Sequence, residues 1–152
     1  IFLDPNVKFS AVMFRRSSFD KAGLFDENLA QHEDGDILLR FSLCMSSVFS
    51  SYPSVKIRRH RQNMSGDSTV LYKSVLESGQ KIINLYPEFK NRLGSKVDNR
   101  FAEIHFQLGK AYIKSGMFKK AFIHFLESRR LSKKYINPSY IISRFFRRFN
   151  DR

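Results

Sequence analysis

Three carboxylates, Glu33, Asp34 and Asp36, are the side chains of this sequence best suited to acid–base chemistry. Apolar residues recur at offsets of three and four over residues 33–45, which predicts a helix that begins at these carboxylates. The helix dipole favours negative charge in the first turn, and a carboxylate that faces a cleft from there can act as a general base. The alternative is that the three residues only cap the helix. We expect Asp36 to face its own helix or to pair with Arg40, which lies one turn further on.

Motifs on both sides of these carboxylates follow one another along residues 8–66. This segment resembles the family-2 glycosyltransferases. Their pattern runs aromatic-Arg-Arg, Gly-x-Phe-Asp-Glu, Glu-Asp-x-Asp and a later Arg, then a strand followed by Arg-x-His and Asn-x-Ser. The matching residues here are Phe14-Arg15-Arg16, Gly23-Leu24-Phe25-Asp26-Glu27, Glu33-Asp34-Gly35-Asp36, Leu39-Arg40, Arg58-Arg59-His60 and Asn63-Met64-Ser65. Each motif alone is a weak signal, whereas their common order and spacing are fairly specific.

The resemblance implies an inverting enzyme that transfers a sugar from a nucleotide-sugar donor to a glycan or lipid-linked acceptor. It implies that Asp34 is the general base for the acceptor hydroxyl and that Glu33 supports it or contacts the acceptor. A leaving diphosphate needs its growing negative charge stabilised. The residues assigned to the acceptor or the diphosphate are Arg15, Arg16, Arg40, Arg58 and Arg59.

A divalent metal, Mg²⁺ or Mn²⁺, is implied for the full-length enzyme, and His60 is the candidate ligand in this chain because a neutral imidazole suits a metal. The alternative for residues 58–61 is a solvated basic loop. Arg15 and Arg16 have a similar alternative, as surface residues.

Other parts of such an enzyme are missing from the sequence. The nucleotide-binding half of the family carries an Asp-x-Asp-type motif that holds the metal and the sugar diphosphate, and Asp34-Gly35-Asp36 has these letters in the wrong context. Gly35 also stands where the family often has an aromatic residue. The chain begins with Ile1 and not with Met. We therefore expect a piece of a longer protein, which alone is inactive and holds no cofactor.

The periodicity of the sequence predicts two parts that meet near residue 66. Residues 1–66 are expected to form the acceptor-side part of an incomplete α/β fold of the GT-A type. Residues 67–152 are expected to form an all-α extension, which makes the chain helix-rich overall. Predicted strands are Phe9–Phe14, Val48–Phe49 and Val55–Ile57. Predicted helices in the extension are about Val70–Tyr86, Asp98–Ser115, Met117–Lys133 and Asn137–Phe149, with Pro87 breaking the first. A short helix through about Ala22 is expected to end at Gly23.

Residues 102–131 resemble one tetratricopeptide repeat. Small residues stand where two antiparallel helices approach and large ones fill the space between them. The residues that fit the repeat are Leu108-Gly109, Tyr112, Gly116, Phe118, Ala121 and Phe125. The alternative is a plain helical hairpin. The helix expected after Pro138 is basic and amphipathic, so it either docks on this hairpin or lies on an anionic membrane.

Charge is distributed unevenly along the chain. Residues 1–53 hold five basic and seven acidic side chains, residues 54–152 hold 22 basic and seven acidic ones, and the net charge is +13. The basic part favours an anionic partner. The alternative function is therefore a basic helical module that binds protein, nucleic acid or an anionic membrane. Nucleic acid is the least favoured, because no known nucleic-acid motif occurs and the acidic part would repel phosphates.

The single cysteine, Cys44, excludes an intrachain disulfide and a cysteine-based zinc site. It favours a reducing, cytoplasmic setting, with peripheral attachment to the inner face of the cell membrane as a further expectation. No signal-peptide pattern is visible. No apolar run approaches the roughly 18 residues of a membrane-spanning helix.

Overall fold

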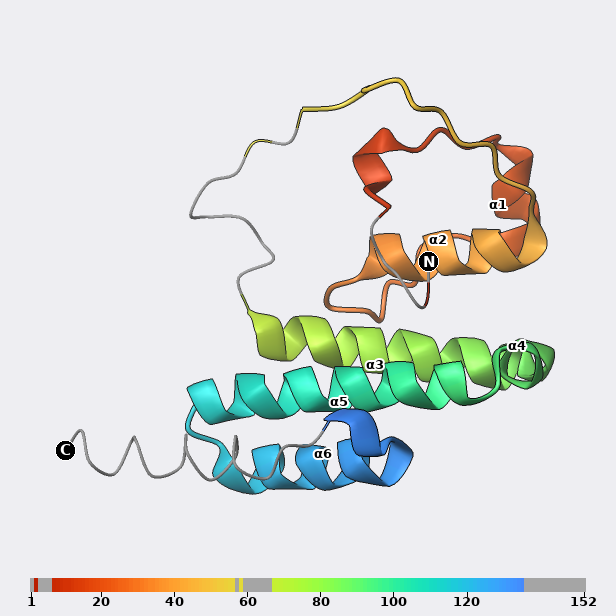
Figure 1. Cartoon of the computed structure of the whole chain (residues 1–152). Helices are drawn as coiled ribbons and strands as arrows, with labels where there is room; N and C mark the ends of the chain where they lie inside the picture. Colours follow the sequence, from red (N-terminus) through yellow and green to blue (C-terminus); the bar gives the residue numbers. More distant parts are fainter. Residues whose placement is uncertain (1, 3–6, 57, 59–66, 136–152) are drawn as a thin grey trace. The chain divides into compact units, whose positions relative to one another are not determined.

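The chain folds mainly into α-helices (Figure 1). The computed structural model describes residues 2, 7–56, 58 and 67–135, and none of these residues lies in a β-strand. The helix-rich character expected from the sequence is confirmed, whereas the α/β part of the expectation finds no support in the described residues. Two compact units, Ile1–Val97 and Asp98–Arg152, make up the chain.

Over its described residues the first unit contains the 3-10 helix η1 (Phe9–Ala11) and the α-helices α1 (Ser17–Ala22), α2 (Glu33–Cys44), α3 (Ser68–Leu85) and α4 (Pro87–Leu93). Local chemistry sets several of their ends. Gly23 ends α1 with φ 79°, a conformation that costs glycine little. Asp67 caps α3 by accepting hydrogen bonds from the backbone N–H groups of Thr69 and Val70. Pro87 separates α3 from α4 and occupies the first turn of α4, where a missing N–H is tolerated.

Phenylalanine rings pack against one face of α2 in the first unit. Ile37 and Phe41 of α2 are buried, and the ring centroid of Phe41 lies 4.9 Å from that of Phe14 and 5.1 Å from that of Phe19. These rings come from α1 and from the segment before it. Burial of apolar surface of this kind, at about 25 cal/mol per Å², fixes one face of α2 and leaves its first turn free for polar residues.

The other neighbour of α2 is α3, which lies beside it (Figure 1). Ser74 and Ser78 of α3 are buried and lie one helical turn apart, so they share a face. The hydroxyl of Ser78 bonds a side chain of α2, and that of Ser74 accepts a hydrogen bond from the N–H of Gln31 in the preceding loop. Through these contacts α3 belongs to the same compact unit as α2, and the two compact units divide between Val97 and Asp98. The division into an acceptor-side part and a helical extension near residue 66 stays a prediction.

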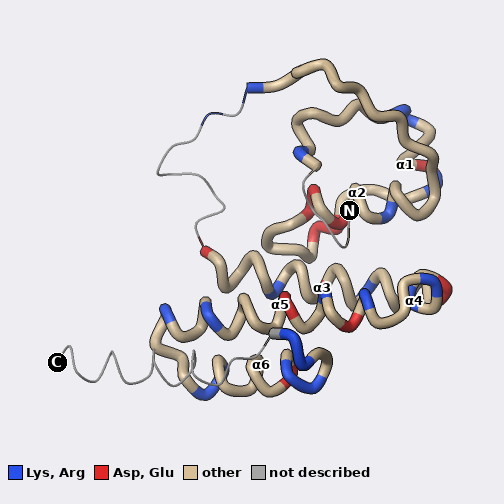
Figure 2. The backbone as a smooth tube through the Cα atoms, viewed as in Figure 1, with Lys and Arg blue, Asp and Glu red and all other residues tan. Residues whose placement is uncertain are grey.

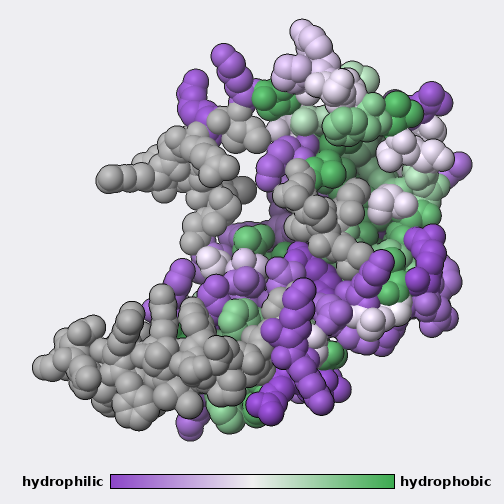
Figure 3. All heavy atoms as spheres, viewed as in Figure 1, coloured by the Kyte–Doolittle hydropathy of each residue, from purple (hydrophilic) through white to green (hydrophobic). Residues whose placement is uncertain are grey.

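The strands expected from the sequence are wrong over the described residues. Phe9–Phe14 begins with the 3-10 helix η1, and Val48–Phe49 and residues 55–56 lie outside any strand. The side chains of Val48 and Phe49 are 99% and 91% exposed. A strand needs a neighbouring strand to satisfy its backbone N–H and C=O groups, and no described segment supplies one. Apolar residues of this unit consequently reach its surface, as Figure 3 shows in green.

The second unit contains a helical hairpin of α5 (Ser95–Lys114) and α6 (Phe118–Leu131), followed by η3 (Lys133–Tyr135). The first three residues of α5 belong to the first unit. Gly116 makes the turn with φ 76°. The Ser128 hydroxyl donates to the Ala102 carbonyl at 2.7 Å, and Phe125 packs against Gly109.

This hairpin matches the two helices predicted around residues 102–131, whereas the resemblance to a tetratricopeptide repeat stays a prediction. The helix expected after Pro138 lies outside the described residues. None of the helices in the described part combines the length and the apolar character that a bilayer crossing requires.

Candidate functional site

The acidic residues of α2 gather at its beginning, as the red segments of Figure 2 show. The three carboxylates are not equivalent. Glu33 and Asp34 are exposed, whereas Asp36 is fully buried. In a helix, residues two positions apart point in widely different directions, so burial of Asp36 and exposure of Asp34 follow from the same backbone. The first turn of α2 therefore offers two carboxylates to solvent and holds the third inside the unit.

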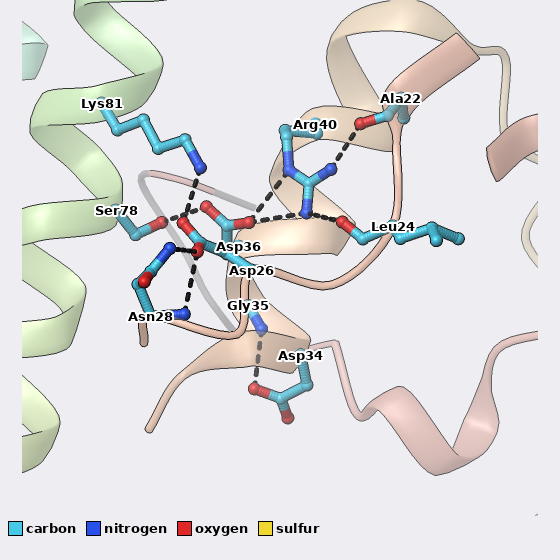
Figure 4. A network of polar contacts seen from close by, with 10 residues as sticks. All are labelled: Ala22, Leu24, Asp26, Asn28, Asp34, Gly35, Asp36, Arg40, Ser78 and Lys81. Atoms are coloured by element: carbon cyan, nitrogen blue, oxygen red, sulfur yellow. Dashed lines mark hydrogen bonds and ion pairs between the residues drawn. The ribbon is translucent and has the colours of Figure 1, made fainter. Parts of the chain in front are cut away.

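Asp36 and Arg40 form a buried ion pair (Figure 4). Nε of Arg40 donates to Oδ2 of Asp36 at 2.9 Å, and Nη2 of Arg40 lies 2.8 Å from the same oxygen. The pairing of these two residues, expected from their spacing of four, is confirmed. The second Asp36 oxygen, Oδ1, accepts a hydrogen bond of 2.8 Å from the Ser78 hydroxyl of α3. Both oxygens of this carboxylate are thus engaged inside the unit.

The remaining donors of Arg40 hold the chain that follows α1. Nη1 donates to the carbonyl of Ala22, and Nη2 donates to the carbonyl of Leu24 at 2.7 Å (Figure 4). Carbonyls at a helix C-terminus lack partners within their own helix, so the guanidinium satisfies them. Arg40 is 6% exposed. These bonds link α2 to the end of α1 and to the segment after it. The contact with acceptor or diphosphate expected for Arg40 stays a prediction.

Asp34 has a different set of contacts. Its Oδ1 accepts a hydrogen bond of 2.7 Å from the backbone N–H of Gly35. Its other oxygen, Oδ2, has no hydrogen-bond partner within the described part of the chain. Such an oxygen can accept a proton or a hydrogen bond from a molecule that approaches the start of α2. Glu33 makes no ion pair with any described residue either.

His32 precedes α2 and lies against its first turn. It has φ 70°, the left-handed region that residues other than glycine rarely adopt. A Cβ added at Gly35 would lie 2.0 Å from Cε1 of the His32 ring. The imidazole therefore occupies the space that a side chain at position 35 would need. A side chain at position 35 would therefore require the His32 ring to move.

The loop between α1 and α2 is tied to α3 by Asp26. Oδ2 of Asp26 lies 2.6 Å from Nζ of Lys81, and Oδ1 accepts hydrogen bonds from the backbone and side-chain nitrogens of Asn28 (Figure 4). The hydrogen bond from Lys81 and those from Asn28 lower the pKa of Asp26 to about 2. Asp26 thus stays ionised at neutral pH and holds the loop that leads into His32 and α2.

The other basic residues expected at the site are either exposed or outside the described residues. Arg15 and Arg16 are exposed just before α1, and Arg58 is exposed. No hydrogen bond or ion pair joins these three arginines to Glu33 or Asp34 within the described ranges. Arg59 and His60 lie outside the described residues.

A divalent metal site needs several His, Cys, Asp or Glu side chains close together. Among residues 2, 7–56, 58 and 67–135, no three His, Cys, Asp or Glu side chains lie close enough together to bind one. Asp36, the carboxylate nearest in sequence to Asp34 within the Asp-x-Asp letters, is already bonded to Arg40 and Ser78. His60, the candidate metal ligand, lies outside the described residues, so the metal implied by the resemblance stays a prediction.

Two residues of this network were not expected from the sequence, Ser78 and Lys81 of α3. They bond Asp36 and Asp26, which precede them by 42 and 55 residues. Ser74, Ser78 and Lys81 recur at offsets of four and three, so they share one face of α3. The helical spacing of these three polar residues was the available signal, although their partners are set by tertiary packing.

A search of protein families, of curated proteins and of solved structures finds no match to this chain.

Proposed function

We propose that this chain is the acceptor-side part of an inverting nucleotide-sugar glycosyltransferase, with Asp34 as its general base. The observation that supports this proposal most directly is the contrast between Asp34 and Asp36. Asp34 is exposed and has a carboxylate oxygen without a partner in the described residues, whereas Asp36 is buried and fully bonded. An exposed base on a helix anchored from inside is the arrangement that proton transfer to a positioned group needs.

In the proposed reaction the acceptor hydroxyl loses its proton to Oδ2 of Asp34 as its oxygen attacks the anomeric carbon. A carbon–oxygen bond to the acceptor forms, the bond to the diphosphate breaks, and its electron pair leaves with the nucleoside diphosphate. Attack from the face opposite the leaving group inverts the anomeric configuration. Oδ1 of Asp34 keeps its hydrogen bond from Gly35, which fixes the orientation of the carboxylate.

The other residues of the site have supporting roles in this proposal. Glu33, exposed beside Asp34, supports the base or contacts the acceptor. The arginines assigned to the acceptor or the leaving diphosphate are Arg15, Arg16, Arg58 and Arg59, because such a group develops negative charge as it departs. Arg40 is assigned to positioning, because its nitrogens already bond Asp36 and two backbone carbonyls.

The donor and the metal belong, in this proposal, to a nucleotide-binding half outside this chain. Mg²⁺ or Mn²⁺ would neutralise charge on the diphosphate when bound there, with His60 as the candidate contribution from this chain. The acceptor is a glycan or a lipid-linked sugar at the cytoplasmic face of the membrane, and the chain alone is proposed to be inactive.

The test compares three amide variants in the full-length enzyme that contains this chain. Asp34→Asn removes the proposed base and is expected to lower the rate of sugar transfer by roughly 10²- to 10⁴-fold. Glu33→Gln is expected to have a smaller effect, and Glu27→Gln, which alters another exposed carboxylate of the same unit, is the matched control. Transfer is followed by product formation and the folded state by circular dichroism. If Asp34→Asn transfers sugar at a near-native rate, Asp34 is not the base.

A further inference from the structure

The helix α6 has a buried face and an exposed face. Ala121, Phe125 and Ser128 are buried against α5, and Ser128 is bonded to the Ala102 carbonyl. These three residues recur at offsets of four and three, so they define the side of α6 that faces α5. The opposite side is left to solvent.

Apolar side chains occupy that opposite side. Phe122, Ile123 and Leu126 are 59%, 58% and 51% exposed. Phe122 and Leu126 lie one turn apart and therefore next to each other, with Ile123 at their flank. Burial of the exposed apolar surface of each side chain against a partner would be favourable in free energy. We call this surface, which consists of Phe122, Ile123, Leu126, Lys119, Arg129 and Arg130, the outer face of α6.

Basic residues share the outer face with the apolar ones. At 100° per residue, Arg129 projects close to Phe122, and Lys119 and Arg130 project between Leu126 and Ile123. All three basic side chains are exposed. Arg130 pairs with Glu127 at 2.7 Å, whereas Lys119 and Arg129 form no ion pair with any described residue. The blue segments of Figure 2 show that Lys and Arg recur along α6 and η3.

This mixture of side chains restricts what can cover the outer face. A dry protein contact would bury Lys119 and Arg129 and would need carboxylates opposite them. Two other occupants from this chain carry few carboxylates. A second copy of α6 presents the same cations and Glu127, which is paired with Arg130, and residues 138–152 hold four arginines and one aspartate. Nucleic acid supplies phosphates, but it offers little to aliphatic side chains such as Ile123 and Leu126.

An anionic lipid surface meets both requirements. Its phosphates attract Lys and Arg, each by about 1 kcal/mol near the surface, and its acyl boundary accepts Phe, Ile and Leu side chains from a helix that lies in the interface. We propose that the outer face of α6 binds an anionic membrane surface. This binding is independent of Asp34, so it can be tested separately from sugar transfer.

The experiment measures co-sedimentation of the 152-residue chain with vesicles. Vesicles of equal parts phosphatidylglycerol and phosphatidylcholine are compared with vesicles of phosphatidylcholine alone, at 0.1 M and 0.5 M salt. We expect binding to the anionic vesicles only, weakened at high salt because the attraction is screened. The double variants Phe122→Ser with Leu126→Ser, and Lys119→Gln with Arg129→Gln, are each expected to lower the affinity at least roughly tenfold.

Matched controls change the same chemistry elsewhere. Val48→Ser with Phe49→Ser removes apolar groups of the first unit that are even more exposed, and Lys90→Gln with Lys96→Gln removes two exposed cations. Neither control is expected to alter vesicle binding by more than about twofold. Thermal unfolding of each variant verifies that the helices remain intact.

Four results would overturn the proposal. Vesicle binding unchanged in both α6 variants would exclude the outer face. Loss of vesicle binding only in Phe145→Ser with Phe149→Ser would assign it to residues 138–152. If the chain binds a single-stranded oligonucleotide but no vesicles, and the α6 variants lose this binding, the partner of the outer face is nucleic acid. A dimer in sedimentation equilibrium that dissociates in Phe122→Ser with Leu126→Ser, again without vesicle binding, would identify a second copy.

Discussion

Asp34 and Asp36 stand two positions apart in α2 and have opposite environments. Asp36 is held by Arg40 and Ser78 inside the first unit, and Asp34 reaches solvent. The sequence predicts the pairing of Asp36 with Arg40, because four residues make one helical turn. It does not predict Ser78, since a contact across 42 residues depends on how α3 packs. The sequence selects Asp34 as the candidate base only through the resemblance, and the structure adds that Asp34 is exposed whereas Asp36 is buried.

The buried ion pair leads to a prediction about stability. Arg40→Met leaves the Asp36 carboxylate buried without its cation and the carbonyls of Ala22 and Leu24 without their donor. Loss of one partner of such a pair costs about 3–5 kcal/mol, so we expect the free energy of unfolding of the first unit to fall by about that amount. Urea unfolding followed by circular dichroism measures it.

The control for this prediction is Arg16→Met, an exposed arginine of the same unit, which is expected to change stability by less than about 0.5 kcal/mol. Equal effects of the two substitutions would show that the Arg40 contacts add nothing to stability.

His105 and His124 make a partly buried polar contact between α5 and α6. Their Nδ1 atoms lie 2.9 Å apart, so one ring donates and the other accepts, and the acceptor must be neutral. Burial lowers the pKa of His105, while Glu127 raises it and Arg130 lowers it by smaller amounts. As the pH falls, His105 therefore takes up a proton at a lower pH in the folded state than in the unfolded chain.

It follows that the second unit loses stability as the pH drops below about 6.5, the ordinary pKa of histidine. We expect the melting temperature to fall by on the order of a few degrees between pH 7 and pH 5. In His105→Gln the fall in melting temperature between pH 7 and pH 5 should be smaller. In His60→Gln, which removes a histidine elsewhere in the chain, it should persist. An identical pH slope in His105→Gln and in the unaltered chain would contradict the prediction.

The helices of the chain were largely predictable from local patterns. Periodicity indicates α2, α3, α5 and α6, and Gly23 and Pro87 mark the ends of α1 and α3 as expected. The short helix α4, which follows Pro87, was not predicted, because seven residues carry little periodic signal. The strands failed for a different reason: alternation of residue types indicates an extended chain, but pairing depends on a partner that the described residues do not provide.

The packing of α5 on α6 gives a prediction about the hairpin. A Cβ at Gly109 would lie 2.8 Å from Cε1 of Phe125, which is 2% exposed and cannot move without disturbing its neighbours. Gly109→Ala gains helix propensity of about 1 kcal/mol, yet overpacking of this kind costs about 1–3 kcal/mol. We expect a net loss of about 1 kcal/mol in thermal or urea unfolding.

The cause can be separated by a double-mutant cycle. In the background Phe125→Leu, which frees space opposite position 109, Gly109→Ala is expected to be neutral or stabilising. A loss of the same size in both backgrounds would show that the ring of Phe125 is not the obstacle.

The two compact units differ in charge and in the roles proposed for them. The acidic start of α2 lies in the first unit and the basic outer face of α6 lies in the second. The sequence alone indicates an uneven distribution of charge, and the compact units divide between Val97 and Asp98. In the functions proposed here, the first unit supplies the base and the second attaches the enzyme to an anionic membrane.

This separation has a consequence for experiments on the whole enzyme. The α6 variants should weaken vesicle binding without altering sugar transfer to a water-soluble acceptor, and Asp34→Asn should do the reverse. Each proposal can therefore fail while the other stands.

The most direct test of Asp34 as general base is the rate of sugar transfer by Asp34→Asn. It is measured in the full-length enzyme at saturating donor and acceptor. We expect a loss of at least roughly 100-fold, with unchanged binding of the nucleotide-sugar donor and with near-native rates in Glu27→Gln. A near-native rate in a correctly folded Asp34→Asn enzyme would contradict the assignment of Asp34 as general base.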